Sequence, residues 1–160
     1  MSPPIRVLFV CTANACRSQM AEAILRHLGG DRFEVASAGV RPIDHVHPLA
    51  IAAIESMGLS ADGQYSKGVE KVADVEFDVI VTVCDSAACL LTTDWPGRPV
   101  FVHWSLADPV THPGLETERI AMAHDTAGRL KRMLKAFVAV RFDELSPSQI
   151  RDQLLRIGQV

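Results

Sequence analysis

The feature that most constrains the fold is a pair of short apolar runs. Residues 5–10 and 78–83 are rich in Val and Ile, and nearly continuous apolar stretches of this length are typical of strands buried on both faces. Such a strand needs cover above and below, so helices must flank it. Both runs are far too short to cross a bilayer. The pattern therefore favours an α/β fold with a parallel sheet between layers of helices.

Extended and helical patterns alternate along the rest of the chain. The remaining expected elements are strands at residues 33–36 and 100–103, helices at 18–28, 48–57, 117–140 and 147–157, and a short helix at 69–75. In the last helix, Pro147 follows Ser146, and Gln149 completes a capping box. This alternation implies right-handed crossovers and places a ligand site at the carboxyl ends of the strands. With 160 residues, we expect one domain spanning residues 1–160.

Composition narrows the classes of function. The formal charge is −3 and no long basic run occurs, so we expect no nucleic-acid partner and no membrane partner. No apolar stretch near the start is long enough for a signal peptide, which favours a cytoplasmic protein. In that compartment the four cysteines are expected to be catalytic, redox-active or metal-binding rather than a disulfide framework. Because the cysteines and histidines lack zinc-type spacing, we expect no metal and no cofactor.

The segment between the first strand and the first helix carries the strongest chemical signal. Its small residues let backbone N–H groups turn inward as an anion nest, next to the positive end of the helix. Arg17 offers a planar fork for two oxygens of a tetrahedral oxyanion. The same positive field predicts a lowered pKa for Cys11, whose sulfur can accept a hydrogen bond from Ser18. The expected oxyanion-binding residues are Thr12, Ala13, Asn14 in a left-handed conformation, Ala15, Cys16 packed behind the loop, Arg17 and Ser18.

This loop, Cys-x-x-Asn-x-Cys-Arg-Ser followed by Met20-Ala21-Glu22, resembles the phosphate loop of the low-molecular-weight protein tyrosine phosphatases. It equally resembles the loop of the arsenate reductases that share their fold. The similarity continues through Ser37-Ala38-Gly39, Trp95-Pro96-Gly97, His103-Trp104 and Asp108-Pro109, and covers nearly the whole chain. It implies a three-layer α/β sandwich, with a four-stranded parallel sheet and helices on both faces.

The resemblance also implies roles for individual residues. Cys11 is the expected nucleophile that attacks the oxyanion held by Arg17, and Asp108 is the expected acid that protonates the leaving oxygen. In an arsenate reductase, Cys84 then attacks Cys11, and Cys89 carries the disulfide to the surface. The implied electron donor is thioredoxin, or glutaredoxin with a small thiol.

Three departures keep alternatives open. In close relatives with a Trp-Pro-Gly segment the later cysteine falls where this chain has Thr92, three residues beyond Cys89, so a small thiol is the alternative to Cys89. A low-molecular-weight phosphatase that hydrolyses phosphomonoesters is the alternative activity. The segment after Asp108 lacks the aromatic residues of tyrosine phosphatases, which favours a small inorganic oxyanion such as arsenate or phosphate. Lys67 stands where some family members have an acidic potassium ligand, so we do not expect bound potassium.

A third hypothesis belongs to another class of function. A thiol protein that binds arsenite or a soft metal, as a sensor or buffer, would bind stoichiometrically without turnover.

Overall fold

The strands form a single parallel sheet, as the sequence predicts. The computed structural model describes residues 3–90 and 94–159, with the side chains of Cys89 and Leu90 excepted. The strands are β1 (Ile5–Cys11), β2 (Phe33–Gly39), β3 (Val79–Thr82) and β4 (Val100–His103), in the order β2-β1-β3-β4. All neighbouring pairs are parallel. The predicted α/β fold with a four-stranded parallel sheet is therefore confirmed.

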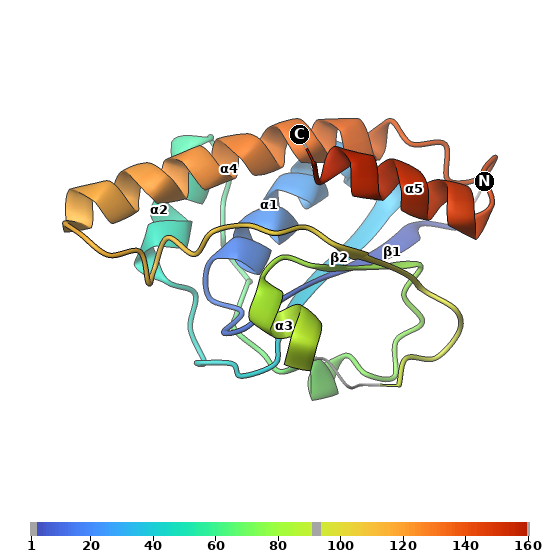
Figure 1. The fold of residues 1–160 in the computed structure, drawn as a ribbon, viewed down its shortest axis with the longest axis horizontal. Coiled ribbons are helices and arrows are strands. Elements are labelled where there is room, and N and C mark those ends of the chain that lie inside the picture. The colour runs from blue at the N-terminus through green and yellow to red at the C-terminus, as the bar shows by residue number, and fades with distance from the viewer. Residues whose placement is uncertain (1–2, 91–93, 160) are drawn as a thin grey trace.

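Helices cover both faces of this sheet. They are α1 (Arg17–Gly29), α2 (Pro48–Ser56), α3 (Asp85–Leu90), α4 (Glu116–Val138) and α5 (Pro147–Ile157), with short 3-10 turns at Gly30–Arg32 and Val69–Lys71. Helices α1, α4 and α5 lie on one side and α3 lies on the other (Figure 1). The capping box at the start of α5 is present as predicted. The short helix expected over 69–75 is reduced to a single 3-10 turn, and α3 was not predicted.

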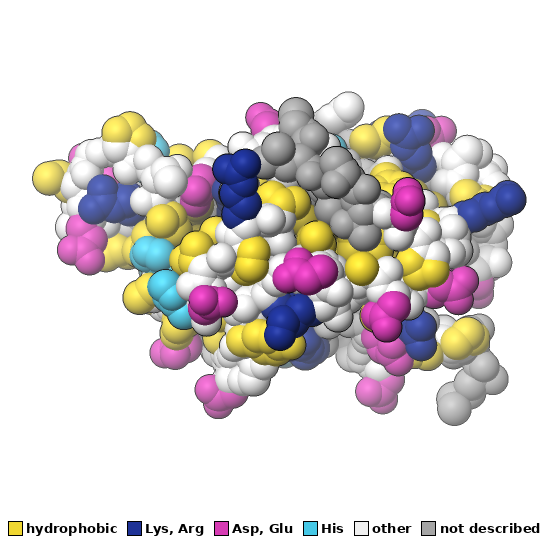
Figure 2. Space-filling view, turned by 90° about the horizontal axis from the view of Figure 1, so that it is seen from below, with side chains coloured by type: hydrophobic (Ala, Val, Ile, Leu, Met, Phe, Trp, Pro, Cys, Tyr) yellow, Lys and Arg dark blue, Asp and Glu magenta, His cyan; other side chains and the backbone are white. Residues whose placement is uncertain are grey.

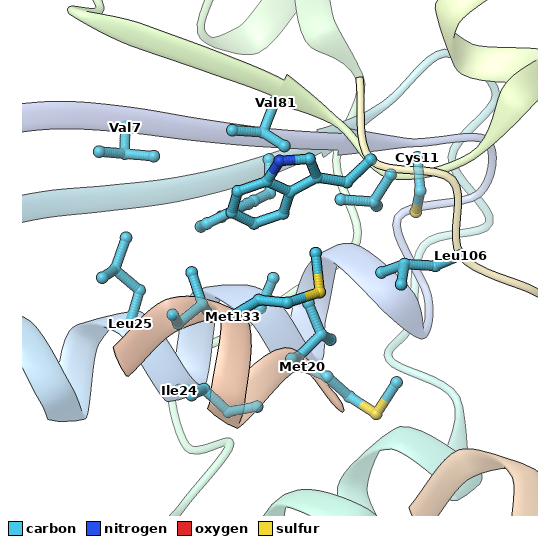
Figure 3. Close-up of a cluster of buried hydrophobic side chains, with 14 of the residues drawn as sticks. Val7, Cys11, Met20, Ile24, Leu25, Val81, Leu106 and Met133 are labelled. Carbon is cyan, nitrogen blue, oxygen red and sulfur yellow. The ribbon is translucent and has the colours of Figure 1, made fainter. Parts of the chain in front are cut away.

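The main core lies between the sheet and α1 with α4. Val7 and Val81 lie on the sheet side of this cluster, Leu25 of α1 and Met133 of α4 lie across from them, and Ile24 and Met20 of α1 lie further from the sheet (Figure 3). The burial of such side chains is the main favourable term in folding. Cys11 and Leu106 lie at the end of this cluster, so the end of the sheet that carries Cys11 is packed directly against the core.

A buried tryptophan fixes the chain just after β4. Trp104 has no exposed surface, and its indole N–H donates to the Leu154 carbonyl of α5 at 2.9 Å. The residues after Trp104 lead to Asp108. The buried tryptophan therefore fixes one end of the loop that carries the Asp108 carboxylate. None of the helices in the described part of the chain is long and apolar enough to span a membrane.

Charge is mixed on the face that carries α3. Viewed from below, Lys and Arg side chains are interspersed with Asp and Glu side chains (Figure 2). Nucleic-acid-binding surfaces concentrate basic side chains on one face, whereas this face carries both signs.

Candidate oxyanion and thiol site

The loop between β1 and α1 is braced from several sides. Asn14 has φ of 51°, the left-handed conformation expected from the sequence. Its Nδ2 donates to Ser18 Oγ at 2.8 Å, and its Oδ1 accepts from the Lys67 backbone N–H at 3.0 Å. Gly39 at the end of β2 passes so close that a Cβ there would lie 2.7 Å from the Thr12 carbonyl oxygen. The loop is therefore held in one conformation by its neighbours.

Cys11 ends β1 with its sulfur beneath this loop. The Asn14 backbone N–H donates to Sγ at 3.2 Å, and Ser18 Oγ lies 2.8 Å from Sγ. Ser18 Oγ already accepts from Nδ2 of Asn14, and this NH2 group can only donate. The hydroxyl hydrogen of Ser18 is therefore free to point at the Cys11 sulfur.

The electrostatics of Cys11 correct one expectation. Burial raises the pKa of the Cys11 thiol above its ordinary value, while Ser18 hydrogen bonds and the charge of Arg17 pull it down. The upward effect is the larger, so the predicted lowered pKa is wrong for this arrangement. The physical reason is that the sulfur is almost fully buried and that the guanidinium of Arg17 is shared with other partners.

Those partners belong to the loop after β4. Arg17 donates to the Leu106 carbonyl at 3.0 Å and lies 3.5 Å from Asp108 Oδ2. Asp108 Oδ1 accepts from the Val110 backbone N–H at 3.0 Å, and Oδ2 accepts from the Thr111 hydroxyl at 3.1 Å. The structure thus brings Arg17, the predicted oxyanion clamp, and Asp108, the predicted acid, to one site, although they are far apart in the sequence.

Cys84 reaches the same site from β3. It follows β3 by two residues, is buried, and its Sγ lies 3.1 Å from Thr12 Oγ1. The Ala87 backbone N–H of α3 also donates to this sulfur at 3.4 Å. Cys11 and Cys84 line one cavity of about 600 Å³. A second thiol therefore lines the same cavity as the predicted nucleophile, and it contacts Thr12 of the predicted oxyanion-binding loop.

The other two cysteines differ from this pair. Cys16 is buried, as expected, but it contributes to the wall of the cavity rather than lying wholly behind the loop. Burial raises the pKa of Cys16 to about 12, which disfavours its thiolate. The backbone of Cys89 belongs to α3, while its side chain and Thr92 lie outside the described residues.

The region behind the loop contains a buried carboxylate, Glu22, near Lys67. Ser37 Oγ donates to Glu22 Oε1 at 2.6 Å, and Arg26 pairs with Glu22 Oε2 at 2.7 Å. Burial lowers the pKa of the Lys67 ammonium below its ordinary value, and the nearby charge of Glu22 offsets this only in part. Within residues 3–90 and 94–159, no group of three or more His, Cys, Asp or Glu side chains is placed to hold a metal ion.

Sequence reasoning passed over one carboxylate. The ring nitrogens of His103 lie 2.8 Å from Thr82 Oγ1 and 2.8 Å from Asp85 Oδ1. Asp85 was not singled out, although its position directly after Cys84 at a strand end was the available signal.

Comparison with known proteins decides the family. Residues 6–112 match the family of the low molecular weight phosphotyrosine protein phosphatases. The chain belongs to this family. Within it, the glutaredoxin arsenate reductase of Synechocystis sp. is 31% identical over 134 residues, which cover 84% of this chain and 96% of that protein.

Solved structures named as arsenate reductases are similar to this chain. An arsenate reductase in its oxidized state has a TM-score of 0.70 and 30% identity, covering 84% of this chain and 96% of that chain. The thioredoxin-dependent arsenate reductase of Corynebacterium glutamicum has a TM-score of 0.60 and 28% identity, covering 86% of this chain and 63% of that chain. The predicted resemblance to the arsenate reductases of this family is thus confirmed.

Proposed function

We propose that this protein reduces arsenate to arsenite, using two of its own thiols as the source of electrons. The observation that carries the proposal is Cys84, a second buried thiol that shares the cavity of Cys11 and contacts Thr12. Hydrolysis of a phosphate ester needs only one thiol, whereas reduction of an oxyanion needs a second. The relatives named as arsenate reductases support the same assignment.

The first step forms a sulfur–arsenic bond. The loop N–H groups and Arg17 hold the arsenate, and the proton of the Cys11 thiol passes to the bound dianion. The Cys11 thiolate attacks arsenic, and Asp108 gives its proton to the departing oxygen, which leaves as water. The products are a cysteinyl arsenate on Cys11 and an ionised Asp108.

The second step carries the reduction. The proton of the Cys84 thiol passes to an oxygen of the arsenic group, the Cys84 sulfur attacks the Cys11 sulfur, a sulfur–sulfur bond forms and the sulfur–arsenic bond breaks. The electron pair of the broken sulfur–arsenic bond goes to arsenic, which leaves as arsenite in the +3 oxidation state. The hydroxyl of Thr12, 3.1 Å from Cys84 Sγ, is placed to donate to the thiolate form of that sulfur.

The last step resets the enzyme. In the proposed relay, Cys89 attacks Cys84 of the Cys11–Cys84 disulfide, and an external dithiol then reduces the Cys84–Cys89 disulfide. Thioredoxin and glutaredoxin with a small thiol are the candidate donors, since relatives bear names of both types. If Cys89 does not take part, a small thiol reduces the first disulfide directly.

The cavity wall favours a small inorganic substrate. After Asp108 it is lined by Val110 and Thr111, so it offers no aromatic side chain there to stack on a phosphotyrosine ring. The alternative function, hydrolysis of phosphomonoesters, remains chemically available to Cys11, Arg17 and Asp108 and defines the second arm of the test.

Three serine variants test the proposal in a steady-state assay of arsenite production with thioredoxin or glutaredoxin and glutathione. Cys11→Ser should abolish activity. Cys84→Ser should stop turnover, and Cys89→Ser should slow recycling by thioredoxin. Arsenite production that survives Cys84→Ser would overturn the two-thiol mechanism. Steady hydrolysis of p-nitrophenyl phosphate without arsenite production would favour the phosphatase instead.

A further inference from the structure

We propose that Asp85, His103 and Ser105 form a hydrogen-bonded anchor that positions Cys84 for its attack on Cys11. Asp85 lines the cavity next to Cys84, whereas His103 and Ser105 are not among its lining residues. Because all three would act through the position of Cys84, we assign them as positioning residues. The inference rests on the proposed function, because it concerns the step in which Cys84 displaces arsenite from Cys11.

The anchor is built on the edge of the sheet. Asp85 Oδ1 accepts from the Ser105 hydroxyl at 2.9 Å and lies 2.8 Å from His103 Nε2. The other ring nitrogen of His103, Nδ1, lies 2.8 Å from Thr82 Oγ1. Thr82 and His103 are paired in register at the ends of β3 and β4. The imidazole is therefore fixed through both nitrogens, and it ties Asp85 to the strands.

This arrangement holds the Cys84 segment at both ends. Thr82 is fixed in the sheet, Asp85 is fixed by the anchor, and only Val83 and Cys84 lie between them. The Val83 backbone N–H also donates to the Val10 carbonyl at 2.8 Å. With both ends held, the sulfur of Cys84 faces Thr12 and the cavity.

Helix α3 cannot supply this constraint alone. It comprises six residues, from Asp85 to Leu90, and so short a helix is not stable without tertiary contacts. Asp85 is its first residue, so the anchor fixes the start of α3 as well as the residue next to Cys84. Without the anchor, the first turn of α3 is free to shift and to carry the sulfur with it.

The anchor contributes to position more than to stability. The Asp85 side chain is 79% exposed and that of His103 is 36% exposed, and hydrogen-bonded pairs in such surroundings add little to folding stability. Hydrogen bonds from His103 and Ser105 lower the pKa of the Asp85 carboxyl, so it is ionised and accepts from both at neutral pH. In contrast, the rate of a reaction between two sulfur atoms depends strongly on their relative position. A displacement of about 1 Å lowers this rate about 100-fold.

The experiment measures the rate at which fully reduced protein forms the Cys11–Cys84 disulfide after one addition of arsenate, without a donor. The variants are Asp85→Ala, His103→Ala and the double variant. His103→Gln keeps a donor near the Nε2 position and serves as the conservative rescue. Glu144→Ala, which removes an exposed carboxylate from a 3.3 Å ion pair with Arg141, is the matched surface control. Protection of each variant by inorganic phosphate against thermal unfolding reports whether the oxyanion loop is intact.

We expect about tenfold slower disulfide formation in both single variants and no further loss in the double variant. The reason is that each of these variants removes the same hydrogen bond between Asp85 and His103. His103→Gln should recover most of the rate, Glu144→Ala should match the wild type, and phosphate protection should persist throughout. Wild-type rates in Asp85→Ala and His103→Ala would overturn the inference, as would single effects that multiply in the double variant. Absence of any disulfide in the wild type would overturn the proposed function itself.

Discussion

Replacing Ser18 by Ala tests how the loop makes Cys11 reactive. The Ser18 hydroxyl lies 2.8 Å from Cys11 Sγ, and its hydrogen is free for the sulfur because Asn14 donates to its oxygen. A hydrogen bond to a charged group contributes about 1.5–3 kcal/mol. Losing it raises the pKa of the Cys11 thiol further and lowers the thiolate fraction at neutral pH by about 10- to 100-fold.

The loss of reactivity is smaller than the loss of thiolate. A more basic thiolate is a better nucleophile, with a Brønsted coefficient of about 0.4–0.5, so alkylation of Cys11 should slow by about 3- to 10-fold. Iodoacetamide labelling across a pH series, with Cys11 followed by peptide mass spectrometry, measures this. Ser37→Ala is the matched control, since Ser37 is equally buried but donates to Glu22. An unchanged rate and unchanged pH midpoint in Ser18→Ala would refute the reasoning.

Gly39, His47 and Asp108 each allow a separate test of the site or of the fold. Gly39→Ala should weaken phosphate binding by at least about tenfold in calorimetry, because its Cβ would lie 2.7 Å from the Thr12 carbonyl oxygen and displace the loop. His47 accepts from the Leu49 backbone N–H through Nδ1 at 3.0 Å, and burial lowers its pKa. The neutral ring therefore stabilises the fold above the ordinary histidine pKa, and this contribution is lost as pH falls through the lowered folded value. Urea unfolding from pH 5 to 8 should show a flatter pH dependence in His47→Asn, which keeps a cap acceptor. Asp108→Asn should slow arsenate-driven loss of thiols at neutral pH by about 10²- to 10⁴-fold in stopped-flow thiol titration, and a rate within twofold of the wild type would exclude it as the acid.

The strands and the oxyanion loop could be predicted because their signals are local. The runs at residues 5–10 and 78–83 are β-branched and apolar, and they became β1 and β3. Pairing of β1 with β3 brings Cys84 and Cys11 to one cavity at the carboxyl ends of these strands. The left-handed Asn14 likewise followed from residue type alone, since asparagine tolerates that conformation.

The parts that escaped prediction depend on contacts between distant segments. Helix α3 is built largely from small residues that suit a turn as well as a helix. The hydrogen bond from the Ala87 backbone N–H to the Cys84 sulfur favours the helix, and the helix sequence does not reveal this contact. The direction of the Cys11 pKa follows from burial, which a loop sequence does not reveal. The bond from His103 to Asp85 joins the end of β4 to the start of α3 and leaves no periodic signal.

In the proposed mechanism, this chain supplies both reducing equivalents to arsenate from its own thiols. The most direct measurement gives fully reduced protein excess arsenate without any donor, then counts remaining thiols and released arsenite. We predict the loss of two thiols and the release of about one arsenite per chain, with the Cys11–Cys84 or Cys84–Cys89 disulfide found by mass spectrometry. Unchanged thiols with no arsenite released would contradict the internal two-thiol mechanism.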